Sequence, residues 1–160
     1  MFGKLNNQEI EDLLHAQVIA RIALVDGEKP YVIPISYGYD GVYVYGFTKE
    51  GLKMDILRKN PNVCLEVENT ENIANWQSVL AWGKFEELKS DPERAQALEV
   101  LSKRILPVLS SETMRLSPLW PFLDEKETKK LEGIAFRIRL EEKTGRFEKS
   151  PRPIYYPAGL

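Results

Sequence analysis

The chain is poor in the residues that build covalent and metal-based sites. Its 160 residues include one cysteine, Cys64, and one histidine, His15. A single cysteine excludes an internal disulfide framework and any multi-cysteine metal site. With one histidine as well, the usual ligand sets of zinc enzymes are missing, and we expect no metal site.

An excess of charge and a long apolar run are also missing. Lys and Arg total 22 against 24 for Asp and Glu, a net charge of −2, so nothing indicates a nucleic-acid partner. Apolar runs such as residues 78–82 are far shorter than the roughly 20 residues that cross a bilayer, and the N-terminal stretch holds no apolar signal core. Hydrophobic residues make up 43 %, enough for a packed core. We predict a single, cytoplasmic domain over residues 1–160 without a membrane partner.

The first third of the chain predicts one helix and three strands. Apolar residues at helical spacing predict a helix over 8–15, with Asn7 as its N-cap. The apolar runs 18–25 and 30–37 flank an Asp-Gly pair, which is a strong hairpin signal. A third run, 42–47, is rich in β-branched and aromatic residues. We expect these three strands to form an antiparallel meander.

The rest of the chain predicts further strands and peripheral helices. The first expected elements are a helix within 49–59, a strand at 63–67 and a long strand at 77–88 with a bulge at Gly83. A second helix is expected to start with Asp91 as its cap and to carry an apolar stripe of Ala95, Leu98, Leu101 and Ile105 up to Pro107. We then expect an irregular segment 109–124, a short helix at 125–131, a strand at 134–140 and an extended Pro-rich tail. Six strands, mostly antiparallel, indicate a mainly β fold with peripheral helices. The pattern alone does not separate a barrel from a sandwich.

Few residues indicate chemistry performed by the protein itself. His15 ends the first predicted helix and is interpreted as a surface residue, and Cys64 lies among strand residues as a buried, inert thiol. No serine elbow or phosphate loop is present. We predict no catalytic side chain, and an enzyme of this composition would depend on a cofactor.

Two segments have the polar groups to hold a cofactor. Between Phe47 and Lys53, a hydroxyl, the N–H groups of a helix start and two lysines can bind a phosphate; the alternative is a capped helix with solvated lysines. The segment 76–78, Trp-Gln-Ser, carries amide and hydroxyl groups that can pair with the edge of a heterocycle. Its alternative is an ordinary strand end.

Five motifs in a fixed order resemble a known family. They are Gly-Glu-Lys-Pro-Tyr-Val-Ile-Pro-Ile-Ser-Tyr at 27–37, Val-Tyr-Val-Tyr-Gly-Phe-Thr at 42–48, Glu-Gly-Leu-Lys at 50–53, Asn-Pro-Asn-Val-Cys at 60–64 and Trp-Gln-Ser-Val at 76–79 with Gly83. This order is similar to that of the flavin-binding split-barrel proteins related to pyridoxamine 5′-phosphate oxidase, in the branch that includes nitroimidazole-resistance proteins. The resemblance runs from about Asn7 to Leu88.

The resemblance implies a homodimer of six-stranded antiparallel split β-barrels with two FMN molecules at the subunit interface. It implies that the strand 32–37 offers backbone groups to the isoalloxazine, that Phe47 and Thr48 meet the ribityl phosphate, that Lys53 binds the phosphate, and that Gln77 contacts the flavin beside Ser78. Arg21 is either a second phosphate ligand or a surface residue. The implied cofactor-binding residues are Val32, Pro34, Ile35, Ser36, Tyr37, Phe47, Thr48, Lys53, Gln77 and Ser78.

The chain departs from the oxidase proper at three positions. Leu52 and Val32 stand where the oxidase has arginines, and Tyr37 stands where it has a lysine that helps to hold the phosphate of the vitamer. The loss of charge-assisted pairs weakens recognition of a dianion. We therefore expect FMN binding to survive and oxidation of pyridoxamine phosphate to be lost.

The leading hypothesis is an FMN-dependent oxidoreductase for a small substrate, such as a nitroaromatic or pyridoxal-like molecule, oriented by Tyr37 and Trp76. One alternative is a haem- or deazaflavin-binding relative, with His15 as a haem ligand. Another is a non-enzymatic dimer that binds a small molecule. The tail 150–160 would then dock on a partner protein or lie across the dimer mate.

Overall fold

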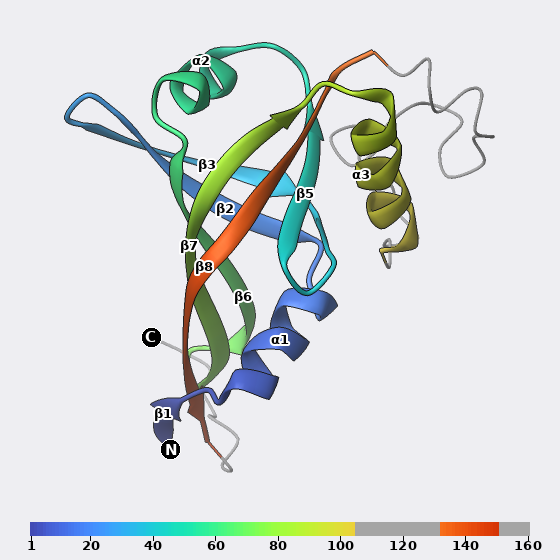
Figure 1. The fold of residues 1–160 in the computed structure, drawn as a ribbon. Helices are drawn as coiled ribbons and strands as arrows, with labels where there is room; N and C mark the ends of the chain where they lie inside the picture. Colours follow the sequence, from blue (N-terminus) through green and yellow to red (C-terminus); the bar gives the residue numbers. More distant parts are fainter. Residues whose placement is uncertain (105–131, 151–160) are drawn as a thin grey trace, which may run out of the picture.

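The chain forms a strongly twisted antiparallel sheet with three helices around it (Figure 1). The structure is a computed structural model that describes residues 1–104 and 132–150, and every count of helices and strands refers to that part of the chain. The elements are β1 (Phe2–Lys4), α1 (Asn7–Ala16), β2 (Ile19–Asp26), β3 (Lys29–Ser36), β4 (Gly38–Tyr39), β5 (Tyr43–Thr48), α2 (Leu52–Lys59), β6 (Asn62–Asn72), β7 (Asn75–Leu88), α3 (Asp91–Lys103) and β8 (Ile134–Lys149).

The sheet has the strand order β3-β2-β6-β7-β8-β5-β4, and β1 pairs with β8 outside this path. All pairs are antiparallel. Because β3 and β4 end the path, the sheet is not closed by hydrogen bonds. The long strands β7 and β8 run through its middle, with α2 near one of their ends and β1 at the other (Figure 1).

One face of the sheet carries the core. Alternate residues of the central strands point inward, among them Ile22, Leu65 and Val79, and each of these side chains has no exposed surface. Burying each such aliphatic side chain is worth about 1.5–3 kcal/mol. Helix α1 closes this core with Leu13 and Leu14. A second, smaller cluster lies under α3 and consists of Tyr45, Leu88, Ala97, Leu101 and Ala135.

The expected meander of three strands is wrong for its third member. The hairpin of β2 and β3 is confirmed, with Asp26 opposite Lys29 across the turn. Strand β5, however, pairs with β8 from Tyr43–Arg139 to Thr48–Ile134 and with the short β4, not with β3. The chain leaves β3 and crosses to the opposite end of the sheet. The sheet has eight strands rather than six because β1 and β4 were not predicted.

Both predicted helix caps lie one residue away from the observed ones. Helix α1 is capped by Asn6, not Asn7: the Asn6 side chain accepts from the Glu9 N–H at 3.0 Å, and the Glu9 carboxylate accepts from the Asn6 N–H at 2.7 Å. Helix α3 is capped in the same reciprocal way by Ser90 with Glu93, not by Asp91. In each case the Glu three residues after the cap selects the position.

The other elements agree with expectation in type but differ in extent. Helix α2 ends before Pro61 as predicted, and the bulge is present as a register shift at Trp82/Gly83. A Cβ on Gly83 would lie 2.2 Å from the Arg139 carbonyl oxygen, so this close approach requires glycine. Strand β8 has 16 residues instead of the seven predicted for 134–140. The buried stripe of α3 contains Ala97, Leu98 and Leu101, whereas Ala95, which was expected in the stripe, is exposed.

Several expectations lie outside the described residues. They concern Ile105, Pro107, the segments 109–124 and 125–131, and the tail from 151 onward. Within the described ranges, no helix is long and apolar enough to cross a membrane.

Candidate functional site

Strand β3 presents an open backbone edge. It pairs only with β2 within the described part of the chain. The Tyr37 N–H donates to the Val18 carbonyl at 3.0 Å, so alternate residues of β3 direct their backbone groups toward β2. The backbone groups of Val32 and Pro34 therefore point to the open edge, and Pro34, which has no N–H, is suited to that position. At these two residues the edge offers one N–H and two carbonyl groups to a ligand.

The predicted site residues of β3 divide between the two faces of the sheet. The side chains of Val32 and Pro34 are exposed, and that of Ser36 is half-buried. Ile35 and Tyr37 point into the core. The Tyr37 hydroxyl donates to the Leu14 carbonyl at 2.7 Å, and burial raises the pKa of this phenol. The expectation that the Tyr37 ring orients a substrate is wrong, because the ring has no exposed surface.

The end of β5 and the start of α2 form the predicted phosphate segment. Gly51 caps α2 with a φ of 157°, a conformation that favours glycine, and no side chain of the described residues caps the helix. The first N–H groups of the helix therefore have no side-chain acceptor. Lys53 is half-buried in the first turn, makes no ion pair with a described residue, and has its pKa lowered by burial. An unpaired, partly desolvated ammonium next to a helix N-terminus is suited to an anion.

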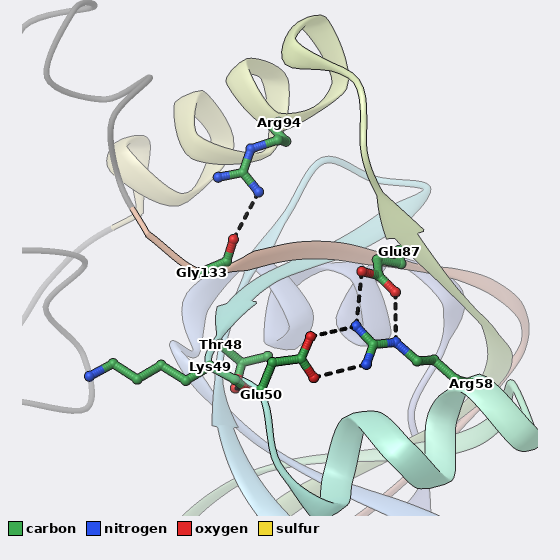
Figure 2. A network of polar contacts seen from close by, with 7 residues as sticks. All are labelled: Thr48, Lys49, Glu50, Arg58, Glu87, Arg94 and Gly133. Atoms are coloured by element: carbon green, nitrogen blue, oxygen red, sulfur yellow. Dashed lines mark hydrogen bonds and ion pairs between the residues drawn. The ribbon is translucent and has the colours of Figure 1, made fainter.

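Contacts with Arg94 of α3 and with Gly133, which precedes β8, hold this segment in place. The ring of Phe47 lies under the Arg94 guanidinium, 5.9 Å from its carbon to the ring centroid. Arg94 also donates to the Gly133 carbonyl at 2.9 Å, as Figure 2 shows. Gly133 lies so close to Phe47 that a Cβ there would be 2.4 Å from the ring. Thr48, at the end of the strand, makes a long hydrogen bond of 3.4 Å from its hydroxyl to the Lys49 carbonyl and no other side-chain hydrogen bond with the described residues.

The start of β7 lies beside the end of β8 in a shallow polar hollow. Gln77 lines this hollow with Trp76 and neighbours from β6 and β8. The Trp76 indole N–H donates to Glu148 at 3.2 Å. Ser78 points to the outer face of the sheet, where its hydroxyl donates to Glu66 at 3.0 Å. Gln77 and Ser78 therefore face opposite sides of the strand, as neighbours in a strand do.

The phosphate segment and the start of β7 lie far apart within one chain. Phe47 pairs with Ala135, near the beginning of β8, whereas Gln77 pairs with Phe147, near its end. Twelve residues of strongly twisted strand separate these two positions, which corresponds to about 35 Å. Figure 1 shows the same arrangement, with α2 and the start of β7 toward opposite ends of the long strands. One ligand of flavin size cannot touch both segments of the same chain.

The residues considered for other roles have ordinary surroundings. Arg21 lies on the outer face and pairs with Glu66 at 3.1 Å and Glu68 at 2.8 Å, so two carboxylates already balance its charge. Cys64 is half-buried, and burial raises the pKa of its thiol. His15 is exposed, with its ring 4.8 Å from that of Tyr39. The described residues contain no cluster of three or more side chains suited to a metal ion.

Sequence reasoning missed one cation beside β3. Arg104, which follows α3, reaches the Ser36 hydroxyl and donates to the Tyr37 carbonyl at 3.3 Å. Burial lowers the pKa of Arg104 to about 10. No local pattern in the sequence predicts this contact, because it joins residues 68 positions apart.

Comparison with known proteins defines the family. The sequence profile of the pyridoxamine 5′-phosphate oxidase family matches residues 6–147. The chain therefore belongs to this family, as its motifs indicated. An uncharacterized protein of Rhizobium meliloti is 31 % identical over 104 residues, which cover 62 % of this chain and 69 % of that protein.

Solved structures share the fold. An FAD-binding protein from Mesorhizobium loti matches with a TM-score of 0.70 and 27 % identity, covering 93 % of this chain and 99 % of its own. A proposed 5-nitroimidazole antibiotic resistance protein from Bacteroides thetaiotaomicron matches with a TM-score of 0.68 and 19 % identity, covering 92 % and 87 %. The predicted mainly β, split-barrel fold is confirmed.

Proposed function

We propose that this protein binds a flavin, FMN, in a site shared between two identical subunits and acts as an oxidoreductase on a small molecule. The separation of about 35 Å along β8 carries this proposal. The family resemblance implies that one flavin meets both Lys53 and Gln77, and a single chain cannot bring them together. A second copy resolves the conflict if Lys53 of one subunit and Gln77 of the partner subunit meet the same cofactor.

The phosphate segment fits the phosphate of a flavin. Lys53 supplies a cation that forms no ion pair with residues 1–104 or 132–150, Thr48 supplies a hydroxyl with a long hydrogen bond, and Gly51 places no side chain over the start of α2. The open edge of β3 fits the other end of the cofactor. Its N–H and carbonyl groups at Val32 and Pro34 match the alternating acceptors and donors on the pyrimidine edge of an isoalloxazine.

The outer face of the sheet fits a second copy. Large apolar side chains of β2, β3 and β7 are exposed there, with Val32 59 % and Trp82 40 % exposed. The register places both in one row with Ala23 and Cys64. Exposed apolar surface of this extent on one face is typical of an interface. The exposed large apolar residues of these three strands are Ile19, Val25, Val32, Leu80 and Trp82.

The bound flavin would supply hydride transfer, and this chain would bind and orient it. No titratable side chain of the site is required as a base. Leu52 and Val32 stand where the oxidase proper has arginines. The loss of these two cations argues against a phosphorylated vitamer as substrate. The FAD-binding relative supports a flavin, and the relative with a proposed role in nitroimidazole resistance makes nitroaromatic compounds the first substrates to test.

An absorbance scan of the purified protein, followed by release and identification of the chromophore, tests the cofactor. We expect flavin bands and FMN in the released fraction. FAD in that fraction would correct the cofactor and leave the flavin site standing. A Soret band would identify haem, in place of flavin, as the bound cofactor. A protein that stays colourless with micromolar FMN would refute the proposal.

A further inference from the structure

Arg58 forms two forked ion pairs at the base of the phosphate segment (Figure 2). Its Nη1 and Nη2 atoms each donate to an oxygen of Glu50 at 2.8 Å. Its Nε and Nη2 atoms donate to Glu87 of β7 at 2.9 and 3.1 Å. Arg58 lowers the pKa of the Glu50 and Glu87 carboxyls, and these carboxylates raise the pKa of Arg58. The three side chains form one cluster, which we call the Arg58 clamp.

The clamp determines where the Glu50 carboxylate lies. Glu50 directly precedes Gly51, the cap of α2, and a carboxylate at the start of a helix is attracted to the free N–H groups of the first turn. Both Glu50 oxygens are instead held by Arg58, which belongs to the last turn of the same helix. Lys49 points in the opposite direction from Glu50 in Figure 2. The segment therefore directs its negative side chain toward β7 and keeps the helix start uncovered.

We propose that Arg58 is a positioning residue that keeps the Glu50 carboxylate away from the anion site at the start of α2, with Glu87 fixing Arg58 in turn. The inference rests on the proposed function, because the anion is the phosphate of the flavin. Without Arg58, the Glu50 carboxylate competes with the phosphate for the N–H groups of α2 and repels it. The clamp acts on the phosphate alone and leaves the ring-binding part of the site unchanged.

The test compares FMN with riboflavin, which has the same ring but no phosphate. Dissociation constants are measured by flavin fluorescence in low salt, where charge effects are least screened. We expect Arg58→Gln to weaken FMN binding about tenfold, the size expected for one uncompensated carboxylate near a dianion. Riboflavin binding should stay unchanged. The double variant Arg58→Gln/Glu50→Gln should recover the FMN affinity of Glu50→Gln alone, because the repelling charge is gone.

Two outcomes would overturn the inference. One is an equal loss of FMN and riboflavin binding in Arg58→Gln, which indicates general loosening of the fold. The other is a loss of FMN binding that Glu50→Gln does not rescue. If Arg58→Gln does not fold, the same binding measurements are made on Glu87→Gln, which loosens the clamp while keeping Arg58. We expect Glu87→Gln to lose less FMN affinity than Arg58→Gln would. The inference requires that adding Glu50→Gln restores this loss as well.

Failure of the proposed function has a different signature. A wild-type protein that binds neither flavin refutes the proposed function itself. A wild-type protein that binds FMN and riboflavin equally well shows that the phosphate does not lie at α2, and with it the inference also fails.

Discussion

Mixing two binding-defective variants determines whether one flavin site uses residues of two subunits. Lys53→Met removes a charged hydrogen-bond donor, which is worth about 1.5–3 kcal/mol or roughly 10–150-fold in FMN affinity. Gln77→Ala removes a neutral hydrogen bond, worth about 1 kcal/mol or roughly fivefold. The two positions lie about 35 Å apart in one chain. In a shared arrangement, a heterodimer of the two variants has one site with both residues intact and one site with neither.

The assay is an FMN titration of the heterodimer, isolated through a different affinity tag on each subunit. We expect two classes of site, one with the wild-type dissociation constant and one weakened by roughly the product of the two single losses. A site built within one chain instead gives one site like each parent variant and none like the wild type. That second pattern would rule out a shared site, because the separation along β8 would then not matter for binding.

Substitutions at three buried residues, Tyr37, Gly83 and Tyr45, should change the stability of the fold. Tyr37→Phe should lower the free energy of unfolding by about 1–2 kcal/mol in urea titrations, because the buried Leu14 carbonyl at the end of α1 loses its donor. Gly83→Ala should lower it by about 1–3 kcal/mol, since the new methyl group would meet the Arg139 carbonyl. Burial raises the pKa of Tyr45 to about 12 from an ordinary value of 10.0, so its contribution to stability is complete below pH 10 and is lost as the pH rises toward 12. Tyr45→Phe should therefore flatten the alkaline loss of stability by about 1 kcal/mol at pH 11.

Matched controls separate these effects from general damage. Tyr31→Phe removes a hydroxyl that makes no hydrogen bond within the described residues, and it should change stability by less than about 0.5 kcal/mol. Lys84→Ala, next to Gly83 but on the exposed face, should be similarly mild. If Tyr31→Phe and Tyr37→Phe destabilise the protein equally, the hydrogen bond to Leu14 is not the cause.

Local signals in the sequence predicted much of the fold. The Asp-Gly turn placed the β2–β3 hairpin, and the Asn60-Pro61 pair ended α2 where the structure ends it. The caps of α1 and α3 were missed by one residue although the sequence contains the deciding signal. In each case a Glu follows the true cap by three residues, as in a capping box.

These local signals do not show which strands pair when the strands lie far apart in the sequence. The alternation in 42–47 identifies a strand but not its partner, which is β8, about 90 residues further along the chain. The second half of β8 was missed because it begins with Glu141, Glu142 and Lys143, which are typical of a solvated polar segment. Lys143, Gly145 and Phe147 face the core side in that half, and of these only Phe147 is a large apolar residue, so apolar alternation does not mark the strand.

The same limit applies to the candidate site. The motifs identified the segments at β3, β5–α2 and β7, but not their separation, which depends on the register with β8. The Arg58 clamp joins Glu50 to a residue eight positions later and to Glu87 on another strand. Neither spacing matches a helical or strand neighbour, so no pattern indicates it.

We propose one flavin per subunit in a site that needs two subunits. The most direct measurement is light scattering on a size-exclusion column with the flavin absorbance recorded in the same run. We expect one peak at twice the subunit mass of 18.4 kDa, with about one FMN per subunit. A monomer that elutes with a full complement of flavin would rule out a site shared between subunits.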